Sequence, residues 1–264
     1  TANTRFNLTN HHLTANAFVS LYFVNNTGAV SEFSICLTPV QTANFLALDV
    51  DPGAQGYLVA VAVDQQGTPI NFNYLEGDAA IKLASGQQAS LKAVAVSALN
   101  LPVFDSPATL NFDGIAYSRL PRTLVADQLK SPLDSNNTLL VVSRIGGNLI
   151  AGSGTALGPV SGNLYDDAGG AFPFTANSSG PQLFNQLSNS FPSVTPTFTQ
   201  IIPAGRTGWL HLAANGDFGI VGAVLNFNGN TATQARAQTG GHLLRALTLT
   251  SSASLTISIL PPAC

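Results

Sequence analysis

The residues of this chain that could do chemistry are few and stand far apart in the sequence. Four histidines are present, at His11, His12, His211 and His242, and none belongs to an H-E-x-x-H metal motif. The chain also has no G-x-S-x-G nucleophile elbow and no G-x-x-x-x-G-K-[ST] phosphate loop. Its two cysteines cannot form an all-thiolate zinc site, which takes four thiolates. We therefore predict no catalytic residue, no cofactor and no enzymatic activity.

Two aspartate pairs are the best remaining candidates for binding a metal ion. Asp49 and Asp51 adjoin a Pro and Gly turn, and Asp166 and Asp167 lie in the segment LYDDAGG. Carboxylate oxygens are calcium ligands, but aspartates at such turns more often accept backbone hydrogen bonds. We keep the four as weak calcium candidates and predict no metal site.

The two cysteines suggest a disulfide. Cys36 lies in the strand-like segment SEFSICLT, and Cys264 is the last residue of the sequence. A bridge between them would tie the C-terminus to the core and stabilise the fold by about 2 to 5 kcal/mol. The alternative is one buried thiol and one frayed terminal thiol. Because the sequence also contains no methionine, we expect a mature secreted protein, extracellular or at the cell surface.

Four N-x-[ST] sequons offer possible glycosylation sites, at Asn7, Asn25, Asn136 and Asn177. They would be glycan acceptors in a eukaryotic secreted protein. In a bacterial protein, the same asparagines are more simply explained as turn residues.

The composition points to a polar surface with little charge. Charged residues make up 9% of the chain and hydrophobic residues 45%, with a net charge of -3. Ten scattered Lys and Arg residues form no basic stripe, so nucleic acid is not expected as a partner. No apolar run approaches the length that spans a bilayer, so membrane insertion is not expected. A weakly charged surface favours association between proteins.

Alternating apolar and polar residues predict strands along almost the whole chain. Clear examples are RFNLTN near the start and ASLTISIL near the end. Clusters of Asn, Gly and Pro separate about a dozen such runs. GQQASLKAVAVSALN, from Gly86, is compatible with either a helix or a strand. We predict an all-β fold with little helix, an antiparallel β-sandwich of the jelly-roll or Ig-like kind.

One hairpin pattern occurs twice. GYLVAVAVD begins at Gly56 and GWLHLAAN at Gly208, and each follows a Pro and Gly turn and leads through a second Gly turn to NFN. This repetition suggests two similar sandwich halves at residues 13–130 and 131–264, after an N-terminal arm at residues 1–12. The segment LKSPLDSNN would link them. A single large sandwich over residues 13–264 is the alternative.

Several longer segments carry a resemblance to a known group of proteins. LDVDPGAQGYLVAVAVDQQGTPINFNYLEGD, LNFDGIAYSRLPRTLVADQL, NSFPSVTPTFTQIIPAGRTGWLHL and the closing PPAC resemble a group of uncharacterised secreted bacterial all-β proteins, over almost the whole chain. That group has no assigned activity to transfer. In overall design alone, the chain also loosely resembles fibre subunits that assemble by donating a strand.

The first ten residues lead to the main functional hypothesis. TANTRFNLTN places Phe6 and Leu8 on one face of a strand. Such a strand could join a neighbouring molecule's sheet, and repeated head-to-tail contacts would build a filament of identical subunits. We therefore predict a structural subunit of an extracellular filament whose partner is itself. The opposing possibility is that residues 4–10 pair within their own sheet.

Two other classes of function stay open. A secreted carbohydrate-binding or adhesin module would take glycans as partners and would need exposed aromatic side chains. Most of the candidates are expected in the core; they are Tyr57, Tyr74, Tyr117, Tyr165 and Trp209. A secreted glycan hydrolase would need two carboxylates close together in space, and spacing along the sequence does not reveal their separation.

Overall fold

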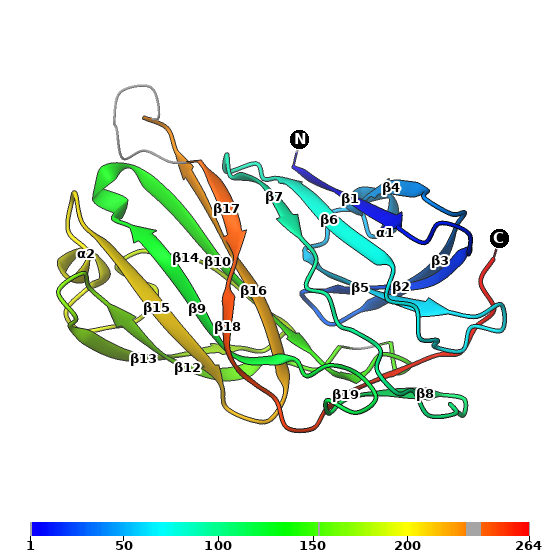
Figure 1. Ribbon diagram of the computed structural model, residues 1–264. Coiled ribbons are helices and arrows are strands. Elements are labelled where there is room, and N and C mark those ends of the chain that lie inside the picture. Colours follow the sequence, from blue (N-terminus) through cyan, green and yellow to red (C-terminus); the bar gives the residue numbers. More distant parts are fainter. Residues whose placement is uncertain (1, 153, 231–238, 264) are drawn as a thin grey trace.

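The fold consists of strands, turns and very little helix (Figure 1). A computed structural model of the chain describes residues 2–152, 154–230 and 239–263. The strands form five small sheets in a five-bladed β-propeller arrangement. The expected all-β character and scarcity of helix are confirmed, but the expected jelly-roll or Ig-like sandwich is wrong. Alternation specifies which face of a strand is buried without specifying which strands pair, so it could not separate five small sheets from two large ones.

The N-terminal part of the chain forms two of these sheets. The β1 sheet has the strand order β4-β1-β6-β7, with β1 at Asn3–Asn10, β4 at Thr42–Leu46, β6 at Leu75–Lys82 and β7 at Gln88–Lys92. The β2 sheet has the order β3-β2-β5, with β2 at Ala17–Asn25, β3 at Val30–Leu37 and β5 at Gly56–Val63. The short helix α1, at Ala47–Val50, follows β4 directly.

The remaining strands form three further sheets. The β10 sheet has the order β14-β10-β16-β17, with β10 at Asn136–Ile145, β14 at Gln182–Gln186, β16 at Gly219–Asn228 and β17 at Gly240–Leu243. The β12 sheet has the order β13-β12-β15-β9-β18, with β9 at Pro121–Lys130, β12 at Gly158–Tyr165, β13 at Ala171–Ser178, β15 at Thr207–Ala214 and β18 at Arg245–Leu249. The β8 sheet has the order β11-β19-β8, with β8 at Ala108–Phe112, β11 at Gly147–Asn148 and β19 at Ala253–Ile257.

Helix is limited to short turns. The helix α2 spans Phe198–Ile201, and a 3-10 turn, η1, spans Pro132–Asp134. No helix in the described parts of the chain has the length and apolar character needed to cross a bilayer. Only the first part of the segment compatible with either helix or strand forms a strand, β7, which pairs with β6 along an antiparallel ladder. Its side chains alternate between the two faces of that sheet, so the period of two prevails over the helical spacing.

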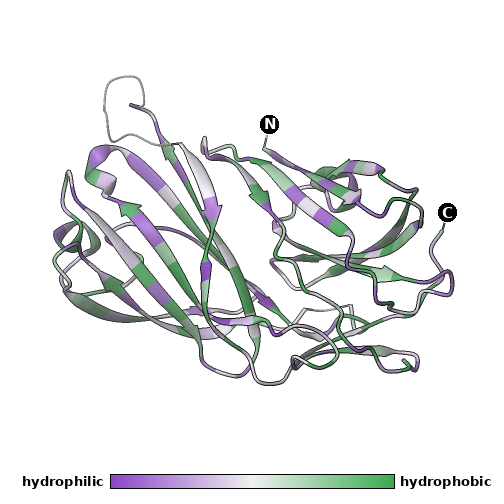
Figure 2. Cartoon of the chain, viewed as in Figure 1, coloured by the Kyte–Doolittle hydropathy of each residue, from purple (hydrophilic) through white to green (hydrophobic). Residues whose placement is uncertain are grey.

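Three apolar cores hold the sheets together. The largest lies between the β12 and β10 sheets, the second between the β2 and β8 sheets, and the third between the β1 and β2 sheets. The β2 sheet therefore has a core on each face. Figure 2 shows how apolar and polar residues alternate along the strands. Each apolar position turned into a core loses contact with water, which is the main force favouring the fold.

The predicted boundary between two halves, which stays a prediction, falls where the chain passes between two strands. The chain passes from β9 to β10 at residues 130–136, where Ser131 is fully buried. Leu129 and Leu140, on either side of this point, belong to the same apolar core. The C-terminal strand β19 pairs with β8, which comes before the boundary. Residues on the two sides of 129–137 are therefore in contact with each other.

The N-terminal strand is an inner strand of its own sheet. β1 pairs with β4 on one edge and with β6 on the other. Phe6 lies opposite Phe45 and Ala79, and Leu8 is buried beside Gly77. Pairing within its own sheet is the second of the two outcomes considered for this segment. Both rows of backbone hydrogen-bonding groups are satisfied there, so donation to a neighbour would require β1 to leave two partners.

Candidate functional site

A candidate binding site lies on the outer face of the β12 sheet. Val160 and Leu164 of β12 point into the core, so Ser161, Asn163 and Tyr165 at the alternate positions point outward. Three cross-strand pairs follow one another along this face, and they are Tyr165 with Trp209, Asn163 with His211, and Ser161 with Ala213. The regular pairing of β12 with β15 therefore places aromatic, amide, imidazole and hydroxyl groups in one row.

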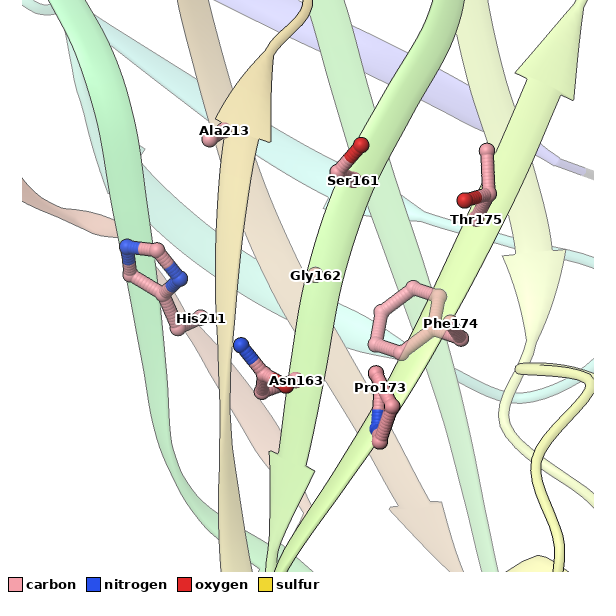
Figure 3. Close-up of a pocket in the computed structure, with 8 residues that line it drawn as sticks. All are labelled: Ser161, Gly162, Asn163, Pro173, Phe174, Thr175, His211 and Ala213. Atoms are coloured by element: carbon pink, nitrogen blue, oxygen red, sulfur yellow. The ribbon is translucent and has the colours of Figure 1, made fainter.

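A shallow hollow of about 460 Å³ opens on this face. Figure 3 shows its lining, which consists of Ser161, Gly162, Asn163, Pro173, Phe174, Thr175, His211 and Ala213. Gly162 allows the strands to approach, because a Cβ atom there would collide with the Phe174 ring and the carbonyl oxygen of His211. Gly162 shares the inward face with Val160 and Leu164, so the absence of a side chain there makes room for the Phe174 ring in the core.

Polar groups in the hollow are available to a ligand. Within the part of the chain that the structure describes, the side chains of Asn163, Thr175 and His211 make no hydrogen bond. Ser161 instead donates from its hydroxyl to the side-chain oxygen of Asn215, at 2.8 Å. An amide offers both donors and an acceptor, and a hydroxyl or a neutral imidazole offers one donor and acceptor capacity. The hollow can therefore exchange hydrogen bonds with a ligand that carries hydroxyl groups.

A stacked aromatic pair borders the hollow. The rings of Tyr165 and Trp209 have centroids 3.8 Å apart and planes 5° from parallel. Trp209 keeps 37% of its surface exposed. Each ring holds the other in place, so the pair stands on the sheet with restricted freedom and presents apolar surface to solvent.

One ion pair is found beyond the aromatic pair. The guanidinium of Arg206 donates to both carboxylate oxygens of Asp167, at 2.5 and 2.6 Å. This interaction with Arg206 lowers the pKa of Asp167 below its ordinary value. Each charge is already neutralised by the other, and none of the residues that line the hollow is acidic or basic apart from His211.

The calcium candidates have other interactions. Asp51 accepts a hydrogen bond from the side chain of Asn25, and Asp166 accepts hydrogen bonds from the backbone of Ala168 and Gly170. Asp49 lies in α1, apart from Asp166 and Asp167. No group of three or more possible metal ligands occurs among the residues described. Asp51 and Asp166 thus accept hydrogen bonds, and Asp167 forms an ion pair with Arg206.

The four sequons differ in accessibility. Asn177 is exposed on β13, whereas Asn136 is only 5% exposed. The side-chain nitrogen of Asn136 donates to the carbonyl of Ser131, and this buried position leaves no room for a glycan. Asn7 donates to Asp78, and Asn25 receives the backbone N–H groups of Thr27 and Ala29 in a turn, which are the contacts of ordinary structural asparagines.

The predicted disulfide falls partly outside the described residues. Cys36 lies on β3, opposite Phe18, but Cys264 is not among the residues that the structure describes. The chain just before it does approach β3, since the backbone N–H of Ala263 donates to the hydroxyl of Ser34 at 2.9 Å. Ser34 and Cys36 are two residues apart on one strand and share a face. The bridge stays a prediction, supported by this approach.

The five candidate aromatics divide between core and surface. Tyr117 is buried, and burial raises the pKa of its hydroxyl to about 12. Tyr57 packs against the core of the β2 sheet, while Tyr74 is half exposed beside His12. The surface position of Trp209 is one that sequence analysis missed. Its signal was the alternation in GWLHLAA, where two leucines in inward positions leave Trp209 on the opposite face.

Comparisons with known proteins add no further assignment. No protein-family model matches the chain, and no curated protein and no solved structure matches it either. The outer face of the β12 sheet must therefore be interpreted from its own geometry.

Proposed function

We propose that this protein is an extracellular module that binds a neutral carbohydrate on the outer face of the β12 sheet and does not catalyse a reaction. The observation that carries this proposal is the stacked Tyr165 and Trp209 pair next to a hollow with unpaired polar side chains. Of the functions considered from the sequence, carbohydrate binding agrees best with this arrangement.

The chemistry of a sugar suits the two parts of the site. A pyranose ring has an apolar face of C–H groups, which can pack on the exposed surface of Trp209. The hydroxyl groups at the rim of the ring can then exchange hydrogen bonds with Asn163, Thr175 and His211. The hollow is shallow and follows the strands, so it suits part of an extended chain better than a ligand enclosed on all sides.

The charge of the site favours a neutral ligand. Of the eight residues that line the hollow, His211 is the one that can carry a charge. The nearby Arg206 and Asp167 are paired with each other. Apart from His211, the lining of the hollow offers a sulfated or carboxylated glycan no cationic side chain to repay the loss of its hydration.

A hydrolytic role at this site is not favoured by the geometry. Glycoside hydrolysis uses two carboxyl groups on either side of the scissile bond, about 5 to 10 Å apart. The lining of the hollow contains no Asp or Glu. Filament formation through β1 also has less support than binding, because both edges of β1 are occupied within the chain.

A glycan array followed by titration calorimetry tests the proposal. We expect saturable binding to at least one neutral polysaccharide, and we expect Trp209→Ala to weaken it tenfold or more. Tyr74→Ala is the matched control, since Tyr74 is another exposed aromatic that does not line the hollow. Binding that survives Trp209→Ala unchanged, or the absence of binding to all neutral glycans, would overturn the proposal.

A further inference from the structure

Asparagine followed by glycine occurs twice in the sequence, at Asn215-Gly216 and at Asn228-Gly229. Asparagine is among the thermally labile residues, because the backbone nitrogen of the next residue can attack its side-chain amide carbon. A glycine at that next position has no Cβ atom to hinder the approach. Since the two pairs have the same local chemistry, any difference in their reactivity must come from the fold.

The first pair lies in an exposed turn. Asn215 and Gly216 connect β15 to β16, and Asn215 is exposed to solvent. Within the described parts of the chain, the side-chain nitrogen of Asn215 and the backbone N–H of Gly216 make no hydrogen bond. The group that would leave and the nitrogen that would attack are therefore both free of other partners.

Two neighbouring groups favour an attack at this turn. The hydroxyl of Ser161 donates to the side-chain oxygen of Asn215 at 2.8 Å. It holds the side chain by its oxygen alone and stabilises the negative charge that develops on that oxygen during the attack. The guanidinium of Arg122 donates to the backbone oxygen of Gly216 at 3.1 Å. A cation so near favours loss of the proton from the backbone nitrogen of Gly216, which makes this nitrogen nucleophilic.

The second pair is held in a buried network. Asn228 ends β16 and is only 1% exposed. Its side-chain nitrogen donates to the backbone oxygen of Asp134 at 2.8 Å and to the side-chain oxygen of Asn136 at 3.0 Å. Its side-chain oxygen accepts the backbone N–H of Asn230 at 2.8 Å. Rotation of this amide towards Gly229 would break these hydrogen bonds, so reaction there requires local opening of the strand end.

We propose that Asn215 is a site of spontaneous deamidation and that the fold protects Asn228 from the same reaction. The backbone nitrogen of Gly216 forms a bond to the side-chain carbon Cγ of Asn215, and the bond from Cγ to the side-chain nitrogen breaks. That nitrogen leaves as ammonia and takes with it the proton of the attacking N–H group. Water then opens the resulting succinimide ring, which gives aspartate or isoaspartate.

The modification changes the edge of the hollow on the β12 sheet. Its product carries a carboxylate in place of the side-chain amide, which adds a negative charge to the net charge of -3. This charge lies beside Ser161, which lines the hollow (Figure 3). Isoaspartate also lengthens the backbone of the turn. The reaction itself does not depend on what the hollow binds.

Mass spectrometry of folded protein incubated in mildly alkaline buffer tests the proposal. Chymotrypsin cleavage at Phe218 places the two asparagines in different peptides. We expect the peptide with Asn215 to show the mass of an amide-to-acid exchange about tenfold or more faster than the peptide with Asn228, which reacts through local opening. In urea, where the fold protects neither pair, the two rates should agree within about threefold. Equal rates in the folded protein, or no reaction at Asn215, would show the proposal to be wrong.

A matched pair of variants tests the chemistry. Gly216→Ala places a Cβ atom beside the attacking nitrogen and should slow deamidation of Asn215 about fivefold or more, whereas Gly229→Ala should leave its rate unchanged. Melting curves check folding, because the Cβ atom added at Gly216 lies 3.0 Å from the Phe218 ring. If that variant does not fold, Asn215→Gln replaces it and should show no mass change in this peptide. An unchanged rate in Gly216→Ala would contradict attack by this nitrogen.

Discussion

The two copies of the repeated hairpin have different roles in the molecule. β5 begins with Gly56, Tyr57 and Leu58, and β15 begins with Gly208 and the equivalent aromatic and leucine. β5 is an edge strand of the β2 sheet, with β2 as its neighbour, whereas β15 lies between β12 and β9. The same short pattern thus forms an edge in one place and an inner strand in the other.

The aromatic residues show the consequence most clearly. Tyr57 packs against the core of the β2 sheet, and its desolvation there raises the pKa of its hydroxyl. Trp209 lies on the surface and stacks on Tyr165. The β2 sheet has another sheet packed on each face, but the β12 sheet has its core on one face. A repeated sequence therefore has an exposed aromatic side chain where the neighbouring sheets leave one face uncovered.

Replacing the leucines that follow the aromatics should give the largest difference in stability between the two copies of the hairpin. Leu210 is fully buried in the core of the β12 sheet, whereas Leu58 is only partly buried and packs beside the core between the β1 and β2 sheets. Leu210→Ala should lower the free energy of unfolding by about 3 to 5 kcal/mol, and Leu58→Ala by about 1 to 2 kcal/mol, because less close packing is lost. Urea denaturation measures both. Equal losses would contradict the difference in packing between the two copies.

The glycines that begin the two copies, Gly56 and Gly208, should respond alike to substitution. A Cβ atom at Gly56 would collide with the carbonyl oxygen of Val24, and one at Gly208 with that of Tyr165. Replacing either glycine with alanine should cost about 2 to 3 kcal/mol, because the neighbouring strand must move. Gly229→Ala is the control, since no atom of the described residues lies within 4 Å of the added Cβ. Losses that match this control would show that the glycines are not needed for close strand approach.

The acid sensitivity of the β15 copy should show a smaller effect. Arg206, just before β15, lowers the pKa of Asp167 by donating hydrogen bonds to its carboxylate. The ion pair therefore stabilises the folded protein above the ordinary aspartate pKa, and this stabilisation is lost as the pH falls through the lowered pKa of Asp167. Because the carboxylate is exposed to solvent, the effect should be slight. The melting temperature of Asp167→Asn should fall less on acidification than that of the unmodified protein, and Asp49→Asn serves as control. If the melting temperatures of the two proteins fell in parallel with pH, the ion pair would not stabilise the folded protein.

Local pattern predicted much of the fold, including its strands and its lack of long helices. The alternation in β15 also indicates that Trp209 faces away from Leu210 and Leu212. Which strands pair was harder to predict from the sequence. β19 joins β8 from the far end of the chain, and no local signal specifies that contact. For the same reason, the hydrophobic face of the first strand did not reveal that β4 and β6 cover both of its edges.

The candidate site depends on such pairing even more strongly. Tyr165 and Trp209 come together only because β12 and β15 share a ladder in a fixed register. The hollow further requires β13 on the other side of β12. The sequence offers the residue types, and the tertiary structure places them on one face.

The fluorescence of Trp209 tests the central claim most directly. It is the single tryptophan of the chain, so any change in indole emission comes from this residue. Titration with the neutral oligosaccharide that binds most tightly on the array should shift its emission to shorter wavelength in a saturable way, as the sugar excludes water from the exposed ring. A bound oligosaccharide that leaves the emission unchanged would contradict a carbohydrate site at the Tyr165 and Trp209 pair.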